Sequence, residues 1–236
     1  MDRDLARQAT AEAVGTALLV AVVVGSGIFA QRLSPGDAGL ELLENSIATG
    51  AGLAALILAF GAVSGAHFNP VVSLADRVLG GLTNRELAVY VPAQIAGGCA
   101  GAMVANLMFD LPAVTLSHHA RSSGGLWLGE VVATFGLLLV ILGVVRSGRA
   151  STAPLAVGGY IAAAYWFTSS TSFANPAVTA ARTLTDTFAG IKPSSAPAFV
   201  AAQLVGGGLA VALAGFLHPS LPAEDVVLPH PDQEHR

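Results

Sequence analysis

The chain has 236 residues, of which 53% are hydrophobic and 11% charged, with a formal net charge of −4. Soluble domains carry about 25% charged residues, so this chain cannot cover a water-facing surface, and its apolar content excludes disorder. The 11 Lys and Arg residues form no cluster, which argues against a nucleic-acid partner. A single cysteine, Cys99, excludes an intramolecular disulfide and a cysteine-based zinc site. An integral membrane protein remains.

Six apolar runs are long enough to be transmembrane helices. In chain order we predict them over about 10–33, 42–63, 85–108, 125–145, 152–170 and 195–217. Two further segments, 64–81 and 170–190, follow the second and fifth runs and are too short to cross a bilayer. The residues 218–236 are rich in Pro, Asp, Glu and His and predict a cytoplasmic tail after a single membrane domain, 1–217.

Basic residues near the ends of the runs set the orientation. If the spans alternate, one side receives Arg3, Arg7, Arg77, Arg85, Arg146, Arg149 and Arg236, and the other Arg32, Arg121, Arg182 and Lys192. The excess predicts a multi-pass protein of the plasma (inner) membrane with both termini in the cytoplasm.

The two halves of the chain, about 10–108 and 125–217, repeat the same order of features. GEVVATFGLLLV (129–140) matches AEAVGTALLV (11–20), FANPAVT (173–179) matches HFNPVVS (67–73), and AQLVGG (202–207) matches AQIAGG (93–98). With three spans in each half, the copies have opposite topology. Inverted repeats of this kind are typical of transport proteins whose pathway lies at the repeat interface.

Each repeat contains an Asn-Pro pair that opens a short segment. An isolated Asn-Pro pair is a turn signal, but Asn is also a strong N-cap, and Pro is well tolerated at the first helical position. We therefore predict two half-helices that start inside the membrane, at Asn69 and Asn175, and meet near its midplane. Two positive dipole ends disfavour cations. The side-chain amides can donate hydrogen bonds, so we expect a neutral, hydrogen-bonding solute.

SGAHFNPVVS and SFANPAVTAAR, together with the duplicated Glu and Gln, resemble the aquaporin or major intrinsic protein family over about 10–217. The resemblance implies an all-α fold of six tilted transmembrane helices and two re-entrant half-helices, a pore in each subunit and a homotetramer. It implies a central motif of Asn69, Pro70, Val71, Asn175, Pro176 and Ala177. Val71 departs from the usual Asn-Pro-Ala triplet, which affects packing and leaves both Asn donors in place.

The resemblance also implies an outer selectivity filter of four side chains. Carried over by spacing from Asn69 and Asn175, these are Thr49, Ala163, Ser172 and Val178, with Ala162 or Ala164 as alternatives to Ala163. The carbonyls expected to line the path belong to Gly65, Ala66, His67, Thr171, Ser172 and Phe173. All four filter residues are small, and Val178 replaces the usual Arg. We expect a wider pore without that electrostatic barrier to cations, and we expect Arg182, one turn further on, to contact headgroups or a neighbouring loop.

Val178, Thr49 and the run FANPAVTAARTLTDTFAGI resemble the aquaglyceroporins of bacterial arsenic-resistance operons. That resemblance implies passage of undissociated arsenous acid and related metalloid hydroxides, together with glycerol-like polyols and some water. We expect no cofactor, no metal site and no catalysed reaction.

Glu12 and Glu130 lie inside apolar runs, where a carboxylate is a functional candidate. The family implies that they instead support the loops before the half-helices, as do Gln94 and Gln203. Three rival functions remain open. One is a general glycerol or urea facilitator. Another is a proton-coupled transporter that uses both Glu residues. The third is a closed adhesive member of the family, which the small filter residues disfavour.

Overall fold

The structure is a computed structural model that describes residues 2–217. Its regular elements are all helical, as predicted: α1 (Arg3–Leu33), α2 (Ala38–Ser64), α3 (Pro70–Leu79), α4 (Asn84–Met108), α5 (Gly124–Arg146), α6 (Ala153–Phe167), α7 (Pro176–Ala181) and α8 (Ala196–Leu217), with the 3₁₀ turns η1 (Ala150–Thr152), η2 (Arg182–Leu184) and η3 (Pro193–Ser195). The predicted tail, 218–236, lies outside the described residues.

Within residues 2–217, five helical segments are long and apolar enough to cross a membrane: α1, α2, α4, α5 and Pro193–Leu217, which contains α8. The predicted span over 152–170 forms α6, which has 15 residues. At 1.5 Å per residue this is about 22 Å, less than the roughly 30 Å hydrocarbon core. The sequence therefore overstated the length of the fifth span, because the chain leaves the helix at Thr168 for the loop that leads to α7.

The two halves pack in the same way: α1 lies against α4 and α2, and α5 against α8 and α6. Glycine marks the equivalent crossing in each half. Gly97 of α4 faces the carbonyl of Ala13, and Gly206 of α8 faces the carbonyl of Val131. A Cβ at either position would overlap that backbone oxygen, so glycine is what lets these helices approach so closely.

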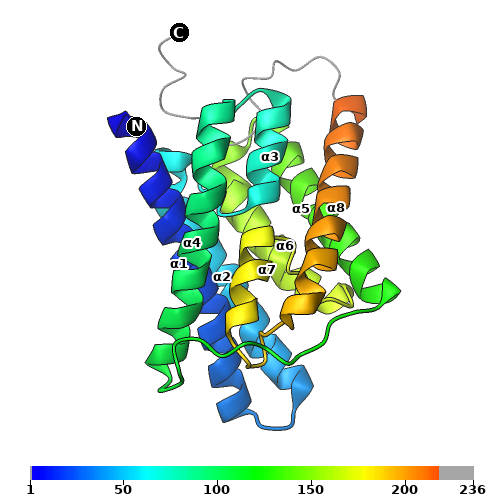
Figure 1. Cartoon of the computed structure of the whole chain (residues 1–236). Coiled ribbons are helices and arrows are strands. Elements are labelled where there is room, and N and C mark those ends of the chain that lie inside the picture. The colour runs from blue at the N-terminus through cyan, green and yellow to red at the C-terminus, as the bar shows by residue number, and fades with distance from the viewer. Residues whose placement is uncertain (1, 218–236) are drawn as a thin grey trace.

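The two half-helices lie inside this frame (Figure 1), and each contacts both α4 and α8. In the figure α3 occupies the end of the bundle near the start of α1, and α7 lies toward the other end. α3 ends at Gly80, a left-handed C-cap with φ of 97°, whereas α7 has only 6 residues and continues into η2. The arrangement places two helix N-termini at the centre of the molecule.

Candidate functional site

Each half-helix begins at its Asn-Pro pair, and the Asn oxygen caps it. Asn69 Oδ1 accepts from the N–H of Val71 at 2.9 Å, and Asn175 Oδ1 accepts from the N–H of Ala177 at 2.9 Å. The following prolines occupy the first helical turn and need no hydrogen-bond acceptor. Local capping chemistry thus fixes where the chain turns back inside the bundle.

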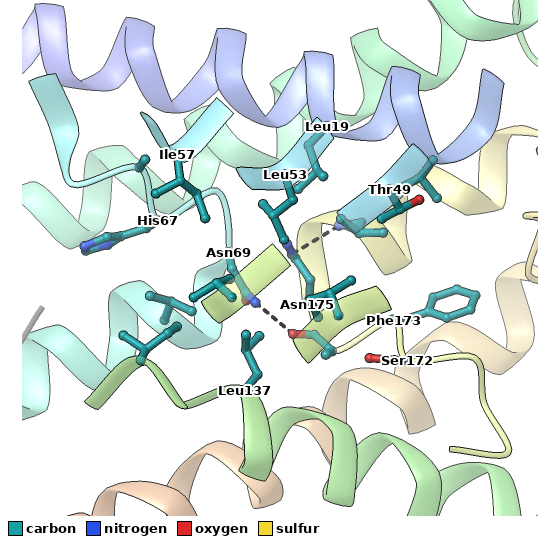
Figure 2. A pocket seen from close by; sticks show the side chains of 18 of the residues that line it. Leu19, Thr49, Leu53, Ile57, His67, Asn69, Leu137, Ser172, Phe173 and Asn175 are labelled. Atoms are coloured by element: carbon teal, nitrogen blue, oxygen red, sulfur yellow. Dashed lines mark hydrogen bonds between the residues drawn. The ribbon is translucent and has the colours of Figure 1, made fainter. Parts of the chain in front are cut away.

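The two Asn side chains also join the halves of the molecule. Asn69 Nδ2 donates to the carbonyl of Ala174, and Asn175 Nδ2 donates to the carbonyl of Phe68, both at 2.7 Å. Figure 2 shows both side chains at the middle of the cavity. A side-chain amide carries two N–H bonds, so each Asn has one N–H for the opposite loop and a second that can serve a solute.

The loops before both half-helices have an unusual backbone. Ala66 and Phe68 in the first loop, and Ser172 and Ala174 in the second, have φ between 49° and 51°. In both loops these residues lie three positions and one position before the Asn. The two repeats therefore share their backbone dihedral angles as well as their sequence pattern. Left-handed conformations at non-glycine residues cost about 1–3 kcal/mol each and persist only where the surroundings hold them.

Glu12 holds the first loop. Its Oε1 accepts from the N–H of His67 at 2.9 Å and from Ser64 Oγ at 2.6 Å. Its Oε2 accepts from the N–H of Phe68 at 2.7 Å and from Gln94 Nε2 at 2.8 Å. The carboxylate is fully buried, and these donors replace the water it has lost.

Glu130 does the same for the second loop. It accepts from the N–H groups of Phe173 and Ala174, each at 2.9 Å, and from Gln203 Nε2 at 2.5 Å. Gln203 also donates to Thr179 Oγ1 of α7. Carboxylate and amide together connect α5 and α8 to the loop and the half-helix between them.

A cavity runs past the two Asn residues and is lined mostly by apolar side chains. Its wall consists of Leu19, Val23, Thr49, Leu53, Ile57, Gly65, Ala66, His67, Asn69, Val72, Leu137, Ile141, Ala153, Val157, Ile161, Tyr165, Ser172, Phe173, Ala174, Asn175, Val178 and Arg182. Thr49, Ser172 and Phe173 lie at one end in Figure 2, and His67 and Ile57 at the other. Of the expected carbonyl-bearing residues, Thr171 is not part of this wall.

The prediction that Ala163 belongs to the filter is wrong, because its side chain is on the exposed face of α6. Ile161 and Tyr165 line the cavity instead. They are four residues apart and share one helix face, whereas Ala163 between them points the other way. The alternatives Ala162 and Ala164 do not line the cavity either. Tyr165 donates from its hydroxyl to Thr49 Oγ1 at 3.2 Å, which closes this side of the wall.

Arg182 is a charged residue of the cavity wall that the sequence did not place there. It is 2% exposed, so it does not contact headgroups. The expected contact with a neighbouring loop is present, since Nε donates to the carbonyl of Ala189. Its position four residues after Val178 was the available signal, because residues at this spacing share a helix face.

At the other end of the cavity His67 is joined to α3. Its Nδ1 lies 3.0 Å from Ser73 Oγ, and its Nε2 lies 3.6 Å from Asp76 Oδ2. Both side chains are essentially inaccessible to solvent. Within residues 2–217 no three His, Cys, Asp or Glu side chains are placed to hold a metal ion.

Comparison with known proteins shows the family of the chain. The chain is 54% identical to the aquaglyceroporin AqpS of Rhizobium meliloti (strain 1021) over 214 residues, 91% of either chain. It is 36% identical over 182 residues to a glycerol uptake facilitator protein of Pseudomonas aeruginosa, which covers 66% of this chain and 64% of that protein. The aquaglyceroporin structure from Plasmodium falciparum superposes with a TM-score of 0.74 at 23% identity, over 91% of this chain and 98% of that one, and so shares its fold. The pattern described as Major intrinsic protein matches residues 2–174, and the chain therefore belongs to the major intrinsic protein family.

Proposed function

We propose that this protein is a passive channel for small uncharged solutes, with arsenous acid and glycerol-like polyols as its main cargo and some passage of water. The observation that carries the proposal is the meeting of two Asn-capped helix N-termini inside one cavity. Helix N-termini repel cations, and the two amides offer donors to hydroxyl-bearing solutes. The proposed working form is a homotetramer in the inner membrane, with both termini cytoplasmic and no catalysed reaction.

The lining of the cavity supports a cargo of neutral polyols. Thr49, Ser172 and Tyr165 supply hydroxyl groups at the end beyond the Asn pair, and Val178 belongs to the same wall. Arsenous acid is neutral at cellular pH and resembles a polyol in its hydroxyl groups. An apolar wall with a few well-placed polar groups is the general form of a site for such ligands.

A proton-coupled mechanism receives no support from Glu12 and Glu130. Neither carboxylate lines the cavity, and all four of their oxygens accept hydrogen bonds from the loops and from Gln94 or Gln203. Protonation of either would remove an acceptor from buried N–H groups, which costs about 1–3 kcal/mol for each orphaned donor. Both residues therefore suit a structural role.

The test is solute flux into proteoliposomes that contain the full chain. Stopped-flow light scattering measures water and glycerol, and elemental analysis of filtered vesicles measures arsenous acid. We expect each flux to rise linearly with solute concentration and to be unchanged when a protonophore dissipates the proton gradient. Saturable flux that stops without the gradient would indicate a transporter. Glycerol or urea flux with no arsenous acid flux would favour the general facilitator.

A further inference from the structure

A buried arginine lies in the cavity wall at a position that the filter pattern does not include. Val178 occupies the place three residues after Asn175, and Arg182 follows it by one helical turn in η2. Both side chains line the cavity. The cavity therefore contains a guanidinium group even though its filter position holds Val.

Two contacts hold the Arg182 side chain in place. Its Nε donates to the carbonyl of Ala189, and its Cζ lies 3.4 Å from the centroid of the Phe173 ring. Stacking on an aromatic face stabilises a guanidinium, most strongly where water is excluded. The N–H of Phe173 donates to Glu130, which fixes the loop that precedes α7. That loop therefore holds the guanidinium of Arg182 in place.

Arg121 makes closely related contacts but lies outside the cavity wall. Its Cζ is 5.2 Å from the centroid of the same ring. Its Nε donates to the carbonyl of Gly190 at 2.9 Å, and its Nη2 to that of Phe188 at 3.3 Å. The two arginines thus fasten the same segment, 188–190, to the same aromatic ring, and they differ in that Arg182 alone reaches the cavity.

The charge of Arg182 is not neutralised by an ion pair. Among residues 2–217, the five ion pairs involve Arg7, Arg85, His67, His118 and His119, and neither Arg182 nor Arg121 takes part. Arginine keeps its proton in essentially every protein environment. A charge beside an apolar, water-poor cavity acts through a low effective dielectric and is felt more strongly than in bulk water.

We infer that Arg182 determines the charge selectivity of this channel: its guanidinium excludes cations, including hydrated protons, at the end of the cavity lined by Thr49 and Phe173. The inference rests on the proposed channel function. It reverses the expectation that a pore with Val178 at the usual Arg position has no electrostatic barrier to cations.

The experiment compares Arg182→Gln, Arg182→Lys and Arg121→Gln with the wild type in proteoliposomes of matched protein content. Leaks of potassium ions and protons into the vesicles are followed with ion-sensitive dyes under a gradient of each ion and without an added ionophore. Glycerol flux is measured on the same vesicles. We expect Arg182→Gln to raise the cation leak about tenfold or more, and its glycerol flux shows that the variant channel is incorporated and open. Arg182→Lys retains the charge and should stay close to the wild type. Arg121→Gln loses the loop contact and a charge that lies outside the cavity wall, so its leak should rise far less than that of Arg182→Gln.

Cation exclusion by Arg182→Gln at the wild-type level, with normal glycerol flux, would overturn the inference. Equal leaks in Arg182→Gln and Arg121→Gln would also overturn it, because they would show that both residues only fasten segment 188–190. If Arg182→Gln does not incorporate into vesicles, Arg182→Met is used instead, because its long side chain can still pack against Phe173. A cation leak of the wild type that rises with the amount of reconstituted protein would contradict the inference directly. Glycerol flux of the wild type separately tests the proposed function.

Discussion

The two loops that lead into α3 and α7 share one design at the backbone and differ in their side chains. In both, left-handed residues stand three and one before the Asn, and a buried Glu from the first helix of the repeat accepts the two N–H groups that precede the Asn. The residue between the left-handed positions is His67 in one loop and Phe173 in the other. The centre of the cavity is therefore pseudosymmetric, whereas its ends are not.

That difference gives the two ends different charges. His67 Nε2 lies 3.6 Å from Asp76 Oδ2 of the half-helix that follows it, so this end of the cavity has a carboxylate next to its ring. Phe173 instead carries Arg182 on its ring, and no carboxylate pairs with that guanidinium within the described part of the chain. The two repeats thus share the hydrogen bonds that fix the loops, whereas the residues next to those bonds differ between the two ends of the cavity.

The largest effect on solute flux is expected from the Asn side chains at the pseudosymmetric centre of the cavity. In Asn69→Asp and Asn175→Asp the side chain still caps its half-helix, but a carboxylate oxygen replaces the Nδ2 that donates to the opposite carbonyl. Two acceptors then face each other, and a negative charge enters the cavity. We expect glycerol and arsenous acid flux to fall at least about tenfold with protein still reaching the membrane. Unchanged solute uptake by vesicles with either variant would refute the assignment of the pathway.

Replacing Glu12 or Glu130 by Ala tests whether the stability of the two halves depends equally on these carboxylates. Glu12→Ala orphans donors from His67, Phe68, Ser64 and Gln94, whereas Glu130→Ala orphans those of Phe173, Ala174 and Gln203. At about 1–3 kcal/mol for each buried donor, both should lower expression and thermal stability in detergent, and Glu12→Ala more so.

The conservative variants separate structure from proton transfer. Glu12→Gln and Glu130→Gln keep one acceptor oxygen, so flux for each correctly folded channel should stay close to the wild type. The measurement is glycerol flux against pH, normalised to the amount of reconstituted protein. Normal expression combined with a large, pH-dependent loss of flux would favour the proton-relay mechanism.

The smallest effect concerns the long loop over the Arg182 end. The N–H of His118 donates to Asp186 at 2.8 Å, and this bond, with the His118 side chain, holds the pKa of the Asp186 carboxyl below its usual value. A lowered pKa means that the contact stabilises the fold fully above the unfolded-state value of about 4, and that this stabilisation is lost as pH falls through the lower folded-state value. Because the carboxylate is 30% exposed, screening limits the effect to about 1 kcal/mol or less.

Thermal melts in detergent between about pH 6 and pH 3 measure this contribution. Asp186→Asn should be slightly less stable than the wild type at the upper end, and the difference should shrink toward the lower end. A constant difference across the range would show that the charge of Asp186 is not the cause.

Sequence rules that act within a few residues predicted where the half-helices begin. They could not predict which side chains of distant segments line the cavity. The starts of α3 and α7 followed from the Asn cap and the Pro that comes after it, which are interactions within four residues. Ala163 was misplaced because counting residues from Asn175 ignores helical phase, and only the packing of α6 shows that Ile161 and Tyr165 face inward. Arg182 could be put on the Val178 face by its spacing, but its direction depends on Phe173 and Ala189, which the chain brings to it by tertiary folding.

The central claim is that solutes pass between the two Asn residues and the wall that contains Val178. The direct measurement is the ratio of solute to water permeability for Val178→Arg, with Thr49→Phe as a second narrowing variant from the opposite wall and Ala163→Phe on the exposed face of α6 as the control. A long side chain at Val178 narrows the cavity, and larger solutes lose most as solute and pore sizes converge. We predict that arsenous acid and glycerol flux fall several-fold more than water flux in the first two variants and stay unchanged in the third. An unchanged arsenous acid to water ratio in Val178→Arg would contradict the account, because Val178 would then not line the path of the solute.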